Sequence, residues 1–407
     1  MRTRLLFGLF FAATSLLLTC GARADGSGHT LYRVINLGDP EGGPDSQGTS
    51  NHQPGWVVGF SLLPDATMHA ELWRDGTAKS LGTLGGPNSA VAWPNRNDHG
   101  VIVGIAETAQ LQPLGENWSC YLAVFFVPSG HVCRGFAWRN GLMSPLPTLG
   151  GDNGFATGVN NRGQIVGWAE NDTHDPTCDE FTNTGQVLQF EAVMWVWDEH
   201  GHQYRALALP PYPGDLDGAA TAINQWGTAV GITGICDGAI GGGTAQHMVM
   251  WRHGRVARSL PTLGGAYWNT PMDINDRGDV AGFADLPGDG PTFPQSNFHA
   301  FFWSARPYNC NGKIKAGTCD LGTLDGQGRS EALGVNDRDQ VVGLSASSGH
   351  AFLWQDGQML DLNELVVPGT RLILTNAQDI NDRGEITGQA TDPDTGATVA
   401  FEAIPVH

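Results

Sequence analysis

The sequence predicts an all-β protein, a seven-bladed β-propeller built from four-stranded antiparallel blades. The first observation behind this is compositional: the 407 residues include 57 Gly, and only 15% are charged, which is typical of short strands joined by tight turns. The second is that two short phrases recur seven times each along the chain, in a fixed order. The third is the spacing of these phrases, which falls to about 45 residues, the length of one propeller blade.

The first phrase is an Asn, a turn and a short strand that ends in Gly. Clear copies are Val159–Gly167, Ile223–Gly231, Ile274–Gly282, Val335–Gly343 and Ile380–Gly388, and looser copies end at Gly59 and Gly104. The second phrase is an aromatic strand. It occurs at His69–Trp73, Arg134–Trp138, Glu191–Trp195, His247–Trp251, His299–Trp303, His350–Trp354 and, degenerate, Val399–Phe401.

A third element, a turn of the Leu-Gly-Thr-Leu-Gly-Gly type, lies between each aromatic strand and the next Asn. It is clearest at Leu81–Gly86, Leu146–Gly151, Leu260–Gly265 and Leu321–Gly326. Each unit therefore contains four strand-sized pieces, as one propeller blade does. The segment Leu31–Gly38 resembles only the fourth strand of a unit, and the chain ends on an aromatic strand. Pairing of the N-terminal strand with the C-terminal strands would close the ring and leave no exposed edge.

These three phrases together resemble the HAF family, extracellular repeat proteins of bacteria. The resemblance rests on strands such as His299-Ala300-Phe301-Phe302-Trp303 and on the linked Leu-Gly-Gly and Asn turns, and it covers about residues 30 to 405. It implies secretion and a repeated fold, and it carries no general biochemical activity. The first, fourth and seventh units depart from the pattern, because there the Leu-Gly-Gly turn or the Trp is lost.

Residues 1–24 read as a secretory signal peptide. Arg2 and Arg4 precede an apolar run, and Ala22-Arg23-Ala24 is a small-residue cleavage motif. The mature protein is then one domain, residues 25–407, secreted to the periplasm or the exterior. The rival interpretation is a lipid anchor on Cys20, which threonine at position 19 makes less favourable. No other apolar run has transmembrane length.

The charge of the chain excludes one class of partner. With 22 Lys and Arg against 41 Asp and Glu, the formal net charge is −19. Such a surface repels a phosphate backbone, so we expect no nucleic-acid partner. We expect a monomer whose partner is an extracellular polysaccharide or a surface protein.

Six cysteines remain after the signal, an even number for an oxidising compartment. Cys310 and Cys319 flank an Asn-Gly turn, and Cys120 and Cys133 close a similar loop, so each pair could staple a hairpin. Cys178 and Cys236 would then pair by elimination. No two cysteines have the C-x-x-C spacing of a zinc site, which makes a metal centre the weaker interpretation.

Residues that recur in most units are interpreted as parts of the blade. The Asn-Asp-Arg-Gly turns need a positive φ at Asn or Gly. The strand histidines have structural roles, because Arg134 and Glu191 replace them in other units. The repeated tryptophans are core residues. Function is therefore expected where the units differ, in the long loops of the second and third units, which should lie on the same face as the Leu-Gly-Gly turns.

That face has aromatic and acidic side chains, a combination that suits sugar rings. The expected ligand-binding residues are Trp118, Tyr121, Trp168, Asp172, Asp175, Tyr267 and Trp268. A binding or scaffold module for extracellular carbohydrate is favoured over an enzyme. The alternatives are a glycoside hydrolase or polysaccharide lyase with a carboxylate pair drawn from Asp172, Asp175, Asp179 and Glu180, or a structural module that recognises another protein.

No cofactor is predicted, and the sequence contains no H-E-x-x-H, P-loop or G-x-S-x-G motif. A structural calcium is the one ion that the acidic clusters suit, through oxygen ligands. The clusters are Asp172–Glu180, Asp285–Asp289 and Asp392–Asp394, none of which has the EF-hand spacing.

Overall fold

The computed structural model describes residues 28–38, 42–53, 55–95, 97–116, 120, 125, 129–180, 185–236, 245–288 and 297–406. The expected signal peptide lies outside these residues. The described part is all-β: its helical turns are two short 3-10 segments, η2 (Cys178–Glu180) and η3 (Leu362–Leu365). None of its helices is long and apolar enough to cross a membrane.

Five of the sheets have four antiparallel strands each, taken in sequence order. The first comprises β6 (Gly85–Ala90), β7 (Ile102–Leu111), β8 (His131–Arg139) and β9 (Leu142–Pro145). The second comprises β10 (Gly150–Val159), β11 (Ile165–His174), β12 (Leu188–Asp198) and β13 (Gln203–Ala208). The third comprises β14 (Asp217–Ile223), β15 (Thr228–Gly234), β16 (Ala245–Arg252) and β17 (Arg255–Leu260).

The next two sheets follow the same order. One comprises β18 (Asn269–Ile274), β19 (Val280–Asp285), β20 (Phe298–Cys310) and β21 (Lys313–Gly322). The other comprises β22 (Ser330–Val335), β23 (Val341–Ser345), β24 (His350–Gln355) and β25 (Gln358–Asp361). The predicted unit of four short antiparallel strands is therefore confirmed.

The two ends of the chain meet in the remaining, eight-stranded sheet. Its first half comprises β2 (Asp45–Gln53), β3 (Trp56–Leu62), β4 (Met68–Arg74) and β5 (Thr77–Ser80). Its second half comprises β26 (Ile373–Ile380), β27 (Ile386–Thr391), β28 (Thr398–Pro405) and β1 (Tyr32–Gly38). The N-terminal strand β1 runs antiparallel to the C-terminal strand β28, from Tyr32 opposite Pro405 to Gly38 opposite Ala400, as the sequence predicts.

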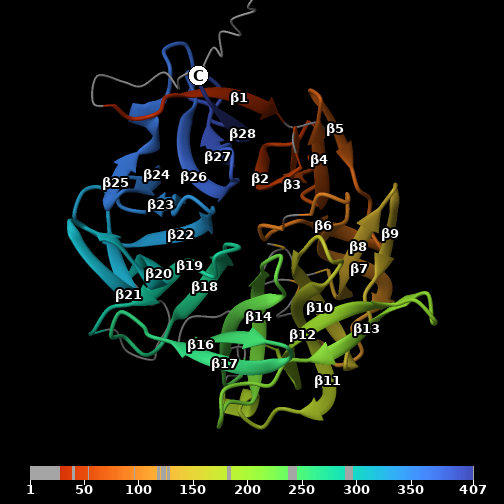
Figure 1. Ribbon diagram of the computed structural model, residues 1–407. Coiled ribbons are helices and arrows are strands. Elements are labelled where there is room, and N and C mark those ends of the chain that lie inside the picture. Colours follow the sequence, from red (N-terminus) through yellow and green to blue (C-terminus); the bar gives the residue numbers. More distant parts are fainter. Residues whose placement is uncertain are drawn as a thin grey trace, which may run out of the picture.

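Figure 1 shows a propeller-like arrangement in which successive sheets follow one another around a common centre. The first strand of each group, such as β14, β18 or β22, lies nearest the centre. The last strands, such as β9, β21 and β25, lie at the outside. Connections between the second and third strands therefore emerge at one face of the molecule, and the Asn turns between the first and second strands emerge at the other.

The Gly that ends each Asn phrase is required by close approach of two strands. A Cβ on Gly167 of β11 would lie 1.9 Å from the carbonyl oxygen of Phe155 on β10. The same clash, at 2.0 Å, would occur between Gly231 and the carbonyl of Ala219. No side chain fits at such a distance, so the recurrence of Gly follows from the sterics of the inner strand pair.

Two of the repeated tryptophans link their sheet to the connection from the preceding sheet. Trp195 and Trp251 are buried, and their indole N–H groups donate to the carbonyls of Pro147 and Pro210, each at 2.7 Å. Both prolines lie in the connection that arrives from the preceding sheet. The core role predicted for these tryptophans is thus confirmed, and burial of a ring with its N–H satisfied adds specificity to the packing.

The Asn turns link neighbouring sheets around the centre. In the turn after β10, Asn160 Oδ1 accepts from the backbone N–H groups of Arg162 and Gln164, while its Nδ2 donates to the carbonyl of Asn224 in the next sheet at 3.0 Å. The same donation recurs from Asn224 to Asn275, from Asn275 to Asn336 and from Asn336 to Asn381, each at 3.0 Å. Each Asn therefore shapes its own turn and holds the next one.

The residue after each Asn adds a second link. The backbone N–H of Gln225 donates to Asp276 Oδ1 at 2.8 Å, and that of Asp276 donates to Asp337 Oδ1 at 2.9 Å. The positive φ of these turns belongs to the Gly, as at Gly163, Gly227 and Gly278, and Asp339 takes it up at φ 60° where Gly is missing. Of the two residues that could take the positive φ, Asn or Gly, it is therefore Gly that does so in these turns.

We expect Gly167→Ala to destabilise the protein by at least about 3 kcal/mol, because overpacking against backbone has no flexible atom to yield. Gly201→Ala is the matched control, since its new methyl group would lie 3.3 Å from the flexible side chains of Asp198 and Gln203. Urea unfolding followed by Trp fluorescence measures both. Equal stabilities of the two variants would contradict the close-approach explanation.

Candidate functional site

The face formed by the long loops is the one predicted to bind a ligand. The Leu-Gly-Gly turn before β10 lies beside the end of β11, where Gly150 pairs with Asn171 and the long loop begins. The same geometry recurs at Gly85 and Thr108. The expectation that these turns and the long loops share one face is therefore correct.

Carboxylates at this face have a repeated structural task. Glu170 of β11 accepts from the backbone N–H groups of Asp152 and Asn153, at 3.1 and 2.7 Å. Asp285 of β19 likewise accepts from those of Tyr267 and Trp268, at 3.0 and 2.8 Å. These acids cap the start of each inner strand, which a buried carboxylate can do because charged acceptors form strong hydrogen bonds.

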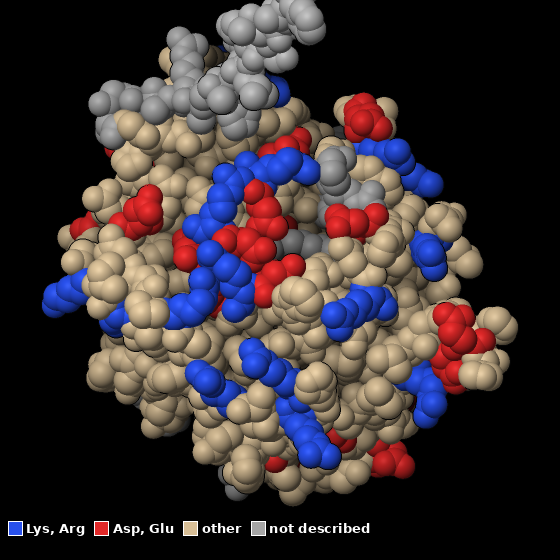
Figure 2. Space-filling model, viewed as in Figure 1, with Lys and Arg blue, Asp and Glu red and all other residues tan. Residues whose placement is uncertain are grey.

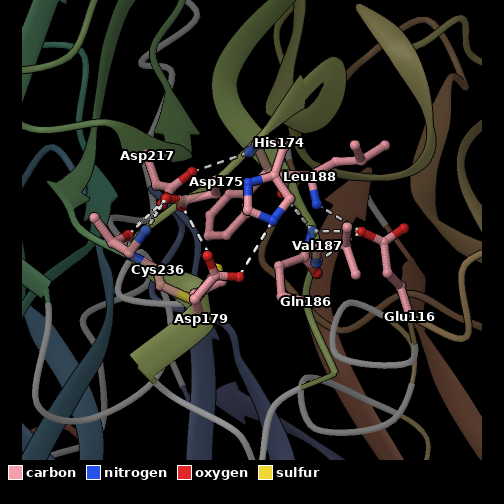
Figure 3. The surroundings of a disulfide bond; sticks show 12 residues. Glu116, His174, Asp175, Asp179, Gln186, Val187, Leu188, Asp217 and Cys236 are labelled. Carbon is pink, nitrogen blue, oxygen red and sulfur yellow. Dashed lines mark hydrogen bonds and ion pairs between the residues drawn. A yellow bond between two sulfur atoms is a disulfide. The ribbon is translucent and has the colours of Figure 1, made fainter.

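Glu116 forms a second buried carboxylate next to Glu170. Its Oε1 accepts from the backbone N–H groups of Val187 and Leu188, at 2.9 and 2.7 Å, and its side chain is only 1% exposed (Figure 3). Gln186 Nε2 donates to Glu170 Oε1 at 3.1 Å and lies 3.5 Å from Glu116 Oε1. Burial and, second, the charge of Glu170 raise the pKa of Glu116 to about 7. Burial also raises the pKa of Glu170.

Three disulfides form, in the pairs Cys120–Cys133, Cys178–Cys236 and Cys310–Cys319 that the sequence suggests. Cys178–Cys236 joins the loop after β11 to the loop after β15, so it ties one sheet to the next (Figure 3). Thr177 Oγ1 accepts from the Cys236 backbone N–H at 2.9 Å and strengthens the same junction. Together with Glu116, this junction fastens the loops of three successive sheets.

The described aromatic residues among those expected to bind sugar are buried or half-buried. Trp168 is 1% exposed, with its ring centroid 4.6 Å from that of Phe155. Trp268 is half-buried against Phe283 and Phe298. The prediction that Trp168 binds a ligand assumed an exposed ring, whereas the indole lies in the protein interior. Tyr267 is half-buried, and Trp118 and Tyr121 lie outside the described residues.

The predicted acids are also committed locally. Asp172 is exposed, whereas Asp175 is buried and its carboxylate accepts from the backbone N–H and the hydroxyl of Thr177. The Asp175 backbone carbonyl accepts from the Cys178 N–H at 3.2 Å. Asp179 is 3.2 Å from His174 (Figure 3). Among the described side chains, Asp175 and Asp179 thus make contacts within their own loop, and a glycoside-cleaving carboxylate pair is not evident among them. The side chain of Glu180 is not described.

Calcium and other metals find no prepared set of ligands in the described part of the chain. Asp285 caps backbone N–H groups, and Asp394 forms an ion pair with Arg371 at 2.6 Å. Asp289 is outside the described residues. Among described residues, the group with three ligand atoms close together is Asp175, Cys178 and Cys236, and its two sulfurs are bonded to each other.

The strand histidines act as structural hydrogen-bonding groups. His299 Nδ1 lies 2.9 Å from Asp320, His350 Nδ1 lies 2.6 Å from Asp361, and His247 Nδ1 lies 2.8 Å from Asp215. The hydrogen bond with Asp320 raises the pKa of His299. The first two pairs fix an aromatic strand to the next strand of its own sheet, β21 or β25, and the third fixes β16 to the connection before β14, in agreement with the structural interpretation.

The opposite face, formed by the Asn turns, carries an exposed aromatic residue that the sequence analysis did not single out. Trp226 is 65% exposed and stands between two cavities of about 300 and 320 Å³. Arg162 and Met194 line one cavity, and Arg252 lines the other, while His253 lines both. The Arg162 guanidinium lies 5.9 Å from the centroid of the Trp226 ring.

A departure from the repeat could have identified this residue. Trp226 occupies the turn position that is Arg in the neighbouring units, namely Arg162, Arg277, Arg338 and Arg383. Differences in loop length between the units point to the other face. Differences in single residues within the turns point to Trp226.

Acidic residues of the turns surround the centre of this face. Asp276, Asp337 and Asp382 line a small central cavity of about 70 Å³. Asp276, Asp337 and Asp382 each accept a backbone N–H from the preceding turn. Figure 2 shows Asp and Glu gathered near the middle of one face, with Lys and Arg bordering them and spread over its lower part.

No protein-family model and no curated protein sequence matches the chain. Three solved structures are similar at a distance. A protein of unknown function from Dyadobacter fermentans has 12% identity and a TM-score of 0.40, with 92% of this chain and 98% of that one covered. A gluconolactonase from Xanthomonas campestris has 10% identity and a TM-score of 0.34, with 95% and 94% covered.

The third is a puromycin-hydrolysing peptidase from Mycobacterium tuberculosis, with 11% identity and a TM-score of 0.40. The alignment covers 94% of this chain and 57% of the peptidase. Such distant likenesses carry no information on the activity of this chain.

We expect the Cys178→Ser, Cys236→Ser double variant to lose more stability than the Cys310→Ser, Cys319→Ser variant. The first disulfide spans 58 residues and the second spans 9. Chain entropy then gives losses of about 4 and about 2.5 kcal/mol. Urea unfolding of the oxidised proteins measures both, and a larger loss at the short hairpin would refute the ranking.

We expect part of the stability to disappear as pH rises from 4.5 towards 7. The folded protein holds the Glu116 proton more tightly than the unfolded chain does, because the pKa is raised from 4.5 to about 7. The stabilisation is complete below pH 4.5 and is lost as pH rises through about 7. Glu116→Gln should flatten thermal stability over this interval.

The exposed Glu364→Gln is the control for this experiment, and it should keep the wild-type pH dependence. Thermal melting at pH 4.5, 5.5, 6.5 and about 7.5 gives the profile. Parallel profiles for wild type and Glu116→Gln would mean that the buried carboxyl does not titrate in this range.

Proposed function

We propose that this chain is a secreted, HAF-like repeat protein that forms a closed seven-bladed β-propeller and binds extracellular carbohydrate. The number of blades follows from counting β26, β27, β28 and β1 as one group and β2 to β5 as the next. Closure is supported by the β1–β28 pairing and by hydrogen bonds from Ser50 and Asn51 to Asp379, each at 3.0 Å. Three disulfides fit an oxidising compartment.

The observation that carries the binding proposal is the position of Trp226. Its ring is 65% exposed, so most of it is accessible to a ligand, and the Arg162 guanidinium lies 5.9 Å from the ring centroid. It separates two hollows lined by hydrogen-bonding side chains, including Arg162, Arg252 and His253. A sugar ring needs this combination, since its apolar face stacks on an aromatic ring while its hydroxyls bond to polar groups at the rim.

The apolar wall of the second hollow extends the surface along the sheet. Met194, Val196 and Leu207 of β12 and β13 line it next to Trp226. Two hollows on either side of one indole offer places for successive sugars of a chain, so an extended polysaccharide is favoured over a free monosaccharide. Binding is favoured over catalysis, because the described acids among those expected to cleave a glycosidic bond are either exposed, as Asp172 is, or bonded within their own loop, as Asp175 and Asp179 are.

We expect Trp226→Ala to weaken retention on polysaccharide about 30-fold, because removal of a central aromatic contact costs about 2 kcal/mol. Trp197→Ala is the matched control. Trp197 is 46% exposed on the same sheet as β13 and packs edge-on against Tyr204, with centroids 5.2 Å apart, outside both hollows.

The measurement is affinity electrophoresis of the mature protein in gels that contain neutral or acidic plant, algal and bacterial polysaccharides. Retardation that is lost in Trp226→Ala and kept in Trp197→Ala supports the proposal. Retardation that both variants keep would place binding elsewhere, and no retardation in any gel would reject carbohydrate as the ligand.

A further inference from the structure

We propose that the Trp226 surface binds an acidic polysaccharide, a chain whose sugars carry carboxylates, and that Arg252 and Arg162 pair with those carboxylates. This inference rests on the proposed function and names its ligand class. The argument comes from the distribution of charge among the turns, from the pairing state of the arginines and from their position beside the exposed indole.

Two positions that are acidic in later turns are neutral in the turn that contains Trp226 and in the turn before it. In the turn phrases the residue after Asn is Asp276, Asp337 or Asp382 in three later units, but it is Asn161 and Gln225 in the units that flank this surface. The fifth residue of the phrase is also neutral here, as Gln164 and Thr228. In two later units it is Asp279 and Glu385. The neutral residues at these two positions leave this part of an otherwise acidic protein with fewer negative charges.

Two of the later turn arginines are paired with carboxylates, while Arg338 donates to the backbone carbonyl of Asp382. Arg277 forms ion pairs with Asp339 and Asp279, and Arg383 pairs with Glu385 at 2.5 Å. Among the described residues, no carboxylate lies within ion-pair distance of Arg162 or Arg252. Their charges are therefore available to a ligand.

Both arginines face the hollows beside the ring. Arg252 ends β16, is exposed and lines the hollow on one side of Trp226. Arg162 is exposed, lines the hollow on the other side and donates to the Trp226 carbonyl at 3.4 Å. A sugar stacked on the indole would have one guanidinium at each side. Arg presents a planar fork that matches a carboxylate, so it selects this group over a neutral hydroxymethyl.

One acid also lines the hollow that contains Arg252. This residue is Asp276, and its Oδ1 already accepts the backbone N–H of Gln225 at 2.8 Å. That hydrogen bond directs the carboxylate to the link between turns. The lower part of the face in Figure 2, where Lys and Arg are spread without a large cluster of acids, agrees with a local cationic surface.

The net charge of −19 limits the charge density of a suitable polyanion. At a distance such a protein repels a polyanion, and only short-range contacts at the arginines favour it. A polymer with one carboxylate per sugar satisfies two arginines with little excess charge. A densely sulfated polymer would place further unpaired charge against the acidic centre of the same face.

The test compares polygalacturonate and alginate with their fully methyl-esterified forms, which keep the sugar chain and remove the charge. Binding of the mature protein is measured by titration calorimetry, with dextran sulfate and dextran as a further pair. We expect the carboxylate forms to bind at least about tenfold tighter than the esters, the effect of one charge-assisted hydrogen bond. Dextran sulfate should bind no tighter than dextran.

Arg252→Ala should lower affinity for the carboxylate form about tenfold and leave affinity for the ester unchanged. The control is Arg205→Ala, which removes an exposed Arg of β13 outside both hollows and should leave both affinities as in wild type. Thermal melting of each variant verifies that it is folded.

The outcomes separate this inference from the proposed function. Equal binding of carboxylate and ester forms, lost in Trp226→Ala, would overturn the acidic-ligand inference and keep carbohydrate binding. Binding of dextran sulfate in preference to the carboxylate polymers would likewise overturn it. Binding of no polysaccharide here and in the gel panel would overturn both.

Discussion

A hydrogen bond from the side chain of one Asn to the main chain of the next unit holds this structure together at its centre. The residue does three things at once, since its Oδ1 accepts two N–H groups of its own turn and its Nδ2 reaches the following turn. If a turn had a different shape, the backbone carbonyl of its Asn would not be in position to accept from the Asn of the preceding unit. Local turn geometry and the arrangement of the sheets therefore depend on the same side chain.

Neighbouring sheets are linked in different ways on the two faces of the protein. On the loop face, buried carboxylates, a disulfide and a threonine are used to fasten the loops of neighbouring sheets. On the turn face, fastening is done near the centre by short turns, and the outer part is left open. The exposed indole of Trp226 and the two hollows beside it lie on this turn face.

The repeat made most of the architecture predictable. Four strands per unit, the pairing of Leu31–Gly38 with the last strand and the three disulfide pairs all follow from recurring phrases or from cysteine spacing. Recurrence succeeds here because each unit must solve the same packing problem. Even so, sequence did not show that the strand histidines pair with Asp320 of β21, Asp361 of β25 and Asp215 of the connection before β14.

The site was harder to predict because chemical type does not reveal which way a side chain points. Trp168 follows a repeated Gly and alternates inward along β11, so its ring enters the core although its loop is long. Asp175 looked like a ligand and proved to be a turn residue. Trp226 lies in a short turn, where loop length gives no signal, and only its departure from Arg in the other units marks it.

The link between Asn and its neighbour has a consequence for how such a protein can change over generations. Its acceptor is a main-chain carbonyl, which every residue possesses. A duplicated unit brings its own donor and supplies an acceptor to whichever unit precedes it, with no matching substitution needed elsewhere. Recombination between units thus preserves the links between neighbouring units, while residues such as Trp226 remain free to diverge one copy at a time.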